Sequence, residues 1–286
     1  MAVFDLILGP ILMGTIVNIF LMGIMLVQCY IYFERFKGDK YWMRPLVWFL
    51  LLIDALGSCF DIAMTYNYLV TNFGNVSAIA VTNVGITPYP LLTGITAFAV
   101  QCFFAWRIKL LVKSDLLAYF IVALSSVQLL ASLGTMIGGI IVKDFASLIK
   151  IKQVSLLWLF GSVVTDAIIT ISLVWFLRRH KTGFEVTDHI TDRIIRLTLQ
   201  TGLLTTTCAL GVVIAYLVSD TTMHLAFGLP LSKLYTNSLM SSLNARKGWN
   251  PGDFAESTST SRSTHIHNEV RNSTTVRYKP VAAEDI

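Results

Sequence analysis

Long apolar segments alternate with short polar ones along most of the chain. Seven apolar segments cover residues 6–33, 45–68, 89–111, 116–142, 154–177, 197–219 and 222–243. Each is about 20 residues long or longer, which is the length an α-helix needs to cross a bilayer. Membrane β-barrel strands would be shorter and would alternate in polarity. The pattern therefore predicts an all-α integral membrane protein, a bundle of seven transmembrane helices.

The last of these segments is the least apolar, which leaves a six-span alternative open. Hydrophobic residues make up 55% of the chain and charged residues 14%, and the mean hydropathy is +0.66. Soluble domains carry about 25% charged residues, so the composition agrees with a membrane protein. The first Lys or Arg is Arg35. Because no basic region precedes the first segment, we expect it to be retained rather than removed as a signal peptide.

Basic residues flank the segments asymmetrically. Three basic residues, Lys143, Lys150 and Lys152, lie between the fourth and fifth segments. Twelve follow the first, third and fifth segments: Arg35, Lys37, Lys40, Arg44, Arg107, Lys109, Lys113, Arg178, Arg179, Lys181, Arg193 and Arg196. Cytoplasmic loops are enriched in Lys and Arg. The split predicts an N-terminus outside, a C-terminus in the cytoplasm, and a plasma-membrane or secretory-pathway location.

The outer loop over residues 71–90 has no charged residue. It contains the sequon Asn75-Val76-Ser77, so Asn75 is a candidate for glycosylation. The four cysteines, in contrast, all lie inside predicted spans. We interpret them as small packing residues rather than a disulfide framework.

Several ionisable and amide side chains lie inside the predicted spans. Asp54 and Asp61 are seven residues apart in the second segment, nearly two helical turns, so both lie on one face. Asp166 is near the middle of the fifth segment and Lys233 near the middle of the seventh, where Asn237 continues a polar stripe. A charge at the membrane centre costs ~2.5–3.5 kcal/mol. We therefore expect these five side chains to face the bundle interior, as a ligand site or a buried charge network.

Depth along the segments suggests which charges meet. Lys233 and Asp54 both lie close to the midpoints of their segments, so the lysine is expected to neutralise Asp54. Asp61 is the next choice, and Asp166 or a wet cavity remains open. Asn237 is expected to hydrogen-bond either member of the pair.

Three further local patterns predict packing and helix ends. Gly134 and Gly138 form a small-xxx-small face, which predicts close helix packing or, less often, a dimer interface. Pro230 removes a backbone donor and should kink the seventh segment one turn before Lys233. Thr187 is a candidate N-cap for a short amphipathic helix that leads into the sixth span.

The C-terminal region differs in composition. "ESTSTSRST" at 256–264 and "NSTTVRYKP" at 272–280 cannot build an apolar core. The chain is thus divided into a membrane domain over 1–246 and a disordered cytoplasmic tail over 247–286. The tail could be controlled by phosphorylation or be a solvated terminus.

No catalytic signature stands out in the sequence. A Gly-rich phosphate loop, an HExxH motif and a nucleophile elbow are all missing. We expect no enzyme activity, no cofactor, no metal site and no nucleic-acid partner, since the pI of 9.0 follows from membrane topology. The expected partners are the lipid bilayer, a small-molecule ligand and a cytoplasmic signalling protein.

The segment "HLAFGLPLSKLYTNSLMSSLNARKGW" at 224–249 resembles the signature of a family of multi-pass membrane proteins from mushroom-forming fungi. That family is defined by a C-terminal domain of unknown function. "FFAWRI" at 103–108 and "KTGFEVTDHITDRIIRLTLQTG" at 181–202 resemble it as well. The domain would cover 163–246. The resemblance implies membrane location and a helical bundle, and it implies no activity.

Four functions remain open. A receptor-like small-molecule sensor is favoured by seven spans, the outer N-terminus, basic inner loops and a Ser/Thr-rich tail. The third segment ends in "AWRIK" and lacks the acid-Arg-aromatic triplet of G-protein-coupled receptors, so coupling to a G protein is not implied. The alternatives are a transporter or channel that uses the buried Asp and Lys groups, and a structural scaffold. A retinal protein is disfavoured, because the third segment has no acid to serve as counter-ion.

Overall fold

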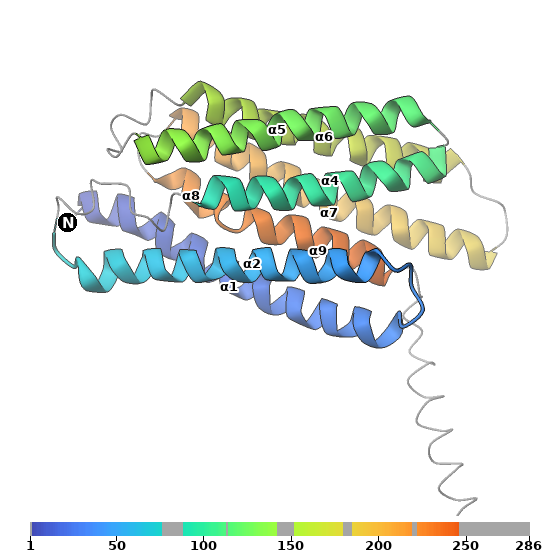
Figure 1. The fold of residues 1–286 in the computed structure, drawn as a ribbon, viewed down its shortest axis with the longest axis horizontal. Coiled ribbons are helices and arrows are strands. Elements are labelled where there is room, and N and C mark those ends of the chain that lie inside the picture. Colours follow the sequence, from blue (N-terminus) through green and yellow to red (C-terminus); the bar gives the residue numbers. More distant parts are fainter. Residues whose placement is uncertain are drawn as a thin grey trace, which may run out of the picture. The chain divides into compact units, whose positions relative to one another are not determined.

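The computed structural model describes residues 2–75, 88–112, 114–141, 152–179, 185–218 and 222–245, without the side chains of 2–5, 177 and 185–196. Every element in these ranges is helical (Figure 1). The long helices are α1 (Ala2–Arg35), α2 (Met43–Tyr66), α4 (Tyr89–Val112), α5 (Asp115–Ile141), α6 (Lys152–Arg179) and α7 (Glu185–Val218). A π-helical turn, η1 (Asn67–Thr71), prolongs α2, and two short helices close the series, α8 (Met223–Gly228) and α9 (Leu231–Asn244).

Six helices of the described chain are long and apolar enough to cross a membrane, namely α1, α2 with η1, α4, α5, α6 and α7. Their outer faces carry large apolar side chains. Phe20, Leu52, Leu130 and Ile171 are each about two-thirds exposed. Lipid tails cover such surfaces, whereas water would leave them as an aggregation hazard. The chain is therefore a multi-pass integral membrane protein.

The seventh predicted segment is divided into α8 and α9. Pro230 has no backbone N–H to continue the helix, and the α-helical pattern stops after Gly228 and resumes at Leu231. The chain keeps its direction across the break, because Leu229 N donates to Leu225 O and Leu234 N donates to Pro230 O, both at 3.0 Å. Pro230 therefore interrupts the regular helix one turn before Lys233, and the bend expected there stays a prediction.

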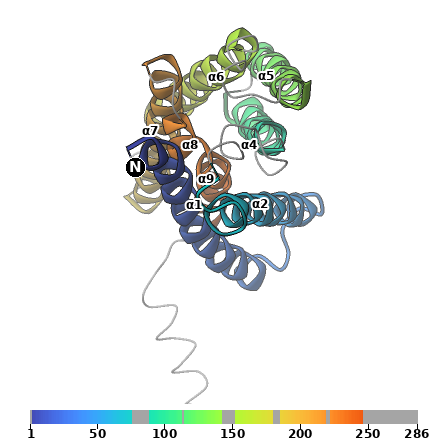
Figure 2. The ribbon, with the colours of Figure 1, turned by 90° about the vertical axis from the view of Figure 1, so that its left-hand side faces the viewer.

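Helix α9 lies in the centre of the bundle, as the end-on view shows (Figure 2). It contacts α1, α2, α4 and α7. Nearly all of its residues are buried, including Lys233, Thr236 and Ser242. A helix enclosed by other helices can carry polar residues, because they face protein partners rather than lipid. The low hydropathy of this segment follows from its central position.

Close helix packing depends on glycines that the sequence pattern did not single out. A Cβ added to Gly94 of α4 would lie 2.0 Å from Ser132 Oγ of α5. A Cβ on Gly14 of α1 would lie 2.7 Å from Leu225 O of α8. Helices can approach this closely only where one of them carries no side chain.

The predicted Gly134–Gly138 face makes a more ordinary contact. A Cβ on Gly134 would lie 3.2 Å from Val154 Cγ1 of α6, and Gly138 is half-buried. Gly134 therefore contributes to the α5–α6 packing without being the closest approach in the bundle.

The start of α7 corrects one prediction. The helix begins at Glu185, two residues before Thr187, so Thr187 lies inside the first turn and is not an N-cap. The segment expected to continue the sixth span is otherwise helical throughout, from Glu185 into α7.

Candidate functional site

Lys233 is fully buried and meets Asp54 of α2. The ammonium Nζ lies 3.4 Å from Asp54 Oδ1, and it also donates to the backbone carbonyl of Asp54 at 2.8 Å. Thr236, about one turn further along α9, donates to Asp54 Oδ2 at 2.6 Å. The carboxylate is thus held from two positions of α9. The pairing predicted from depth is confirmed in the structure.

Asn237 contacts the pair through the backbone of Lys233. Its amide donates to Leu21 O of α1 at 3.1 Å and to Lys233 O, the backbone carbonyl, at 2.7 Å. It bonds neither the ammonium of Lys233 nor the carboxylate of Asp54, although it follows Lys233 by about one turn. The expected hydrogen bond to a member of the pair is thus present, but it is made to the backbone carbonyl of Lys233 and not to the ammonium. Asn237 ties α9 to α1.

Asp61 lies on the same face of α2 but has an amide as its partner. Asn18 of α1 donates to Asp61 Oδ2 at 2.9 Å and to Leu229 O at 2.8 Å. Ser58 in turn donates to Asn18 Oδ1 at 2.9 Å. Asn18 therefore joins α1, α2 and the break between α8 and α9. Sequence reasoning missed Asn18, although an amide inside an apolar segment is the signal that could have found it.

A small cavity separates Asp61 from Lys233. It offers about 10 Å³ to the centres of water-sized molecules, enough for about one water. Gly57 is one of its walls, and a Cβ there would lie 3.4 Å from Lys233 Nζ. Thr93 and Ser232 also line this space. Lys233 and a second carboxyl, that of Asp61, thus line the same small cavity.

Asp166 belongs to a separate cluster. Gln101 Nε2 of α4 donates to Asp166 Oδ1 at 3.0 Å, and the Tyr235 hydroxyl donates to Asp166 Oδ2 at 2.7 Å. Tyr235 is two residues from Lys233, about 200° around α9. The structure therefore brings Asp54, Asp61 and Lys233 together and leaves Asp166 on the opposite face of α9.

The two clusters differ in charge balance. Lys233 and Asp54 neutralise each other, whereas no described Lys, Arg or His forms an ion pair with Asp61 or Asp166. Their printed partners are neutral amides and a hydroxyl. A bare carboxylate in the membrane interior is costly. Each of these two carboxyls therefore needs a proton, a cation or water.

The structure says less about the predictions for metal sites, for glycosylation at Asn75 and for the tail. Within the described ranges, no group of three or more His, Cys, Asp and Glu residues could hold a metal ion. The side chain of Asn75 is exposed after the η1 turn, and Val76 and Ser77 of its sequon lie outside the described residues. The tail over 247–286 also lies outside them.

These features define a multi-pass helical membrane protein with a polar centre. Residues 162–248 match the model of a family of unknown function (DUF6534). The match begins in α6 and includes Asp166, Lys233 and Asn237, and it supports the expected C-terminal domain of unknown function. Neither the curated proteins nor the solved structures contain a significant match to this chain.

Proposed function

We propose that the chain is a seven-span, receptor-like sensor of a small solute, with the N-terminus outside and the C-terminus in the cytoplasm, and that it is not an enzyme. The main observation in support of a seventh span is that α8 and α9 run parallel to α1. Side chains of the C-terminal segment donate to three α1 carbonyls: Thr222 to Ile7 O at 2.6 Å, Asn237 to Leu21 O at 3.1 Å and Asn244 to Gln28 O at 3.0 Å.

The length of this alignment supports a complete crossing. From Ile7 to Gln28, at ~1.5 Å per residue, the two segments run side by side for ~30 Å. That distance is comparable with the hydrocarbon thickness of a bilayer. Since α1 is apolar and long enough to cross, α8 and α9 together reach the same depths. Their lower hydropathy does not oppose the crossing, because α9 is enclosed by other helices.

Positive charge at one end of the bundle supports the orientation. Arg35 ends α1, Lys109 lies in the last turn of α4, and Arg178 and Arg179 end α6. Figure 1 has these helix ends on its right-hand side. The C-terminal part of α9 is at the same end, since Arg107 donates to Ser242. Cytoplasmic ends of spans are enriched in Lys and Arg.

The central position of Lys233 supports a sensor. Any solute or ion that changes the contacts of Lys233 with Asp54 or Asp61 acts directly on α9. Helix α9 contacts four of the long helices, and its C-terminal part lies at the end of the bundle that carries the basic residues. A shift of α9 would therefore carry the change to the cytoplasmic side. A pure scaffold gains little from such a centre, since an apolar core of similar volume is often as stable as a buried ion pair.

A transporter is the second candidate, and the unpaired carboxyls of Asp61 and Asp166 favour it. Acidic side chains inside the membrane often mark ion or proton paths. The two cavities beside them hold only one or a few water molecules. The sequence also has no evident repeat between its halves, which many transporters possess. A sensor needs only a local site, so we rank it first.

A thermal-shift screen of the full chain in detergent tests the proposal. We expect at least one small metabolite or ion to raise the melting temperature, by roughly 5 °C or more at a concentration 100-fold above its dissociation constant. The hit should then be tested in proteoliposomes. Binding without flux supports a sensor, flux of the hit would favour the transporter, and a complete absence of hits would favour a scaffold.

A further inference from the structure

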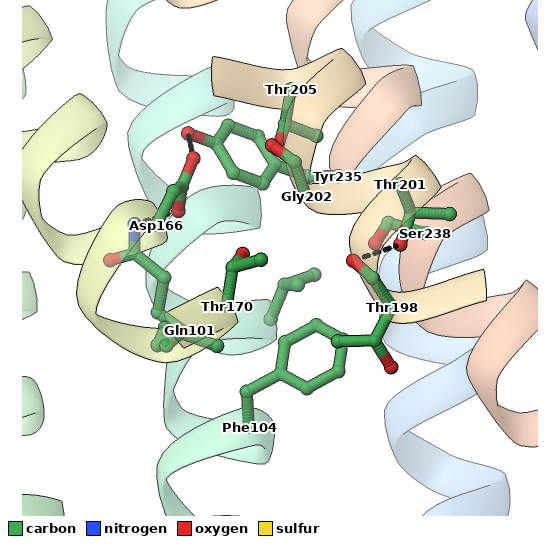
Figure 3. A pocket seen from close by; sticks show the side chains of 12 residues that line it. Gln101, Phe104, Asp166, Thr170, Thr198, Thr201, Gly202, Thr205, Tyr235 and Ser238 are labelled. Carbon is green, nitrogen blue, oxygen red and sulfur yellow. Dashed lines mark hydrogen bonds between the residues drawn. The ribbon is translucent and has the colours of Figure 1, made fainter. Parts of the chain in front are cut away.

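A small cavity lies beside Asp166, between α4, α6, α7 and α9. It offers about 30 Å³ to the centres of water-sized molecules, which is room for an ion and about one water. Figure 3 shows its polar side chains around one space. Eight of its twelve lining residues carry a side-chain oxygen: Gln101, Asp166, Thr170, Thr198, Thr201, Thr205, Tyr235 and Ser238. The other four are Val100, Phe104, Ile169 and Gly202.

The hydroxyls that line this cavity keep oxygen lone pairs. Thr201 donates its hydroxyl hydrogen to Leu197 O at 2.8 Å, and Thr205 donates to Gly202 O at 3.1 Å. A hydroxyl that donates to its own helix keeps lone pairs for a further partner. Tyr235 likewise donates its hydroxyl hydrogen to Asp166. Oxygen lone pairs suit a cation and repel an anion.

Gln101 binds Asp166 through its amide nitrogen, and in Figure 3 its carbonyl oxygen points away from the space between the other side chains. Its side chain is 1% exposed. Gln101 therefore positions the carboxyl of Asp166 and adds no oxygen ligand to the cavity.

The charge of Asp166 also indicates a cation. Asp166 has only neutral partners within hydrogen-bond distance, Gln101 and Tyr235, so its carboxylate is uncompensated at mid-membrane depth. One carboxylate balances one positive charge. Divalent cations such as Ca²⁺ usually take several carboxylates, and none of the described residues adds a second one to this lining.

We propose that this cavity binds a small monovalent cation, with sodium as the best fit to its size. Asp166 supplies the negative charge, and the hydroxyl of Thr205, with water, completes an oxygen shell. A cation here ties α6 to α7. The close approach of α6 and α7 is built in, because a Cβ on Gly202 would lie 2.2 Å from Thr170 Oγ1.

This inference goes beyond the sensor function and does not depend on it. The cavity lies on the opposite face of α9 from Lys233. A sodium ion could hold the bundle together whether or not a solute is sensed elsewhere. Its failure would therefore leave the solute screen unaffected, and a screen without organic hits would leave sodium binding to be measured on its own.

The melting temperature of the full chain in detergent tests the proposal. It is measured at fixed pH and ionic strength in NaCl, KCl and choline chloride. We expect a saturable rise in sodium, of roughly 5 °C or more at 100-fold excess over the dissociation constant, and little change in choline. Asp166→Asn should abolish the sodium effect, whereas the matched variant Asp61→Asn should keep it.

Two further measurements keep the test decisive if Asp166→Asn fails to fold. The wild-type protein should bind radioactive sodium saturably, close to one ion per chain, with displacement by unlabelled sodium and not by choline. Thr205→Val, which keeps the shape of the side chain and removes one oxygen, should weaken that binding about tenfold, as expected for the loss of one such contact. Equal melting in all three salts with no saturable sodium binding would overturn the proposal. A melting temperature that depends on pH and not on sodium would overturn it in favour of a bound proton.

Discussion

Replacing the buried lysine, in Lys233→Ala, is expected to lower the free energy of unfolding by about 3–5 kcal/mol. The reason is that Asp54 would remain in the bundle interior with its cation gone. Asp54→Ala should have a loss of similar size, because it leaves the Lys233 ammonium without a carboxylate. Removing both charges together leaves neither stranded. The double variant should therefore recover much of the loss, as a double-mutant cycle in detergent melting or denaturant unfolding would measure.

An exposed ion pair of the same protein is the matched control. Lys37 and Glu34 are 3.1 Å apart, closer than Lys233 and Asp54, but their side chains are 71% and 62% exposed. Surface pairs contribute about 0–1 kcal/mol. Lys37→Ala should therefore have little effect. Additive losses for Lys233→Ala and Asp54→Ala, with no recovery in the double variant, would show that the two charges do not stabilise each other.

The second large effect is expected at the α4–α5 contact. Gly94→Ala should destabilise the bundle by about 1–3 kcal/mol, the usual cost of overpacking. The added Cβ would lie 2.0 Å from Ser132 Oγ and 2.6 Å from Ser132 Cβ, so the two helices would have to separate. Ser132→Gly removes both of these atoms. It should restore most of the stability in the double variant, as measured by thermal melting.

Gly23→Ala in α1 is the control, since no atom lies within 4 Å of its added Cβ. Alanine favours a helix over glycine by up to ~1 kcal/mol, so this variant should be neutral or slightly more stable. The opposite signs of two chemically identical substitutions would establish close packing at Gly94. Equal effects of both variants would contradict it.

The six long spans and the Lys233–Asp54 pair could be predicted because each follows from positions along the helix axis alone. Apolar length sets which segments cross, and depth sets which charges can meet. The partners Asn18 and Thr236 depend on how each helix is rotated about its axis. A span that is apolar on all sides gives no sequence signal for that rotation, so these contacts could not be predicted.

Helix rotation also determines the contacts of Asn237 and Asp166. Asn237 was assigned to the charge pair because it follows Lys233 by four residues, whereas its amide faces α1. Asp166 is at a similar depth to Lys233, but it bonds Tyr235 on the other face of α9. The closest glycine contacts could not be predicted from the sequence for a related reason. The pattern of Gly134 and Gly138 is visible in one helix, whereas the Gly94–Ser132 contact requires knowledge of both.

Cysteine labelling of intact cells tests the central claim, that α8 and α9 form a seventh crossing. Single cysteines are placed at Asn72 and at Thr258 in a variant whose four native cysteines, Cys29, Cys59, Cys102 and Cys208, are replaced by alanine. Seven spans with an outer N-terminus predict that a membrane-impermeant maleimide labels the cysteine at 72, and labels the one at 258 only after permeabilisation. Labelling of both positions in intact cells would mean six crossings and would contradict the account.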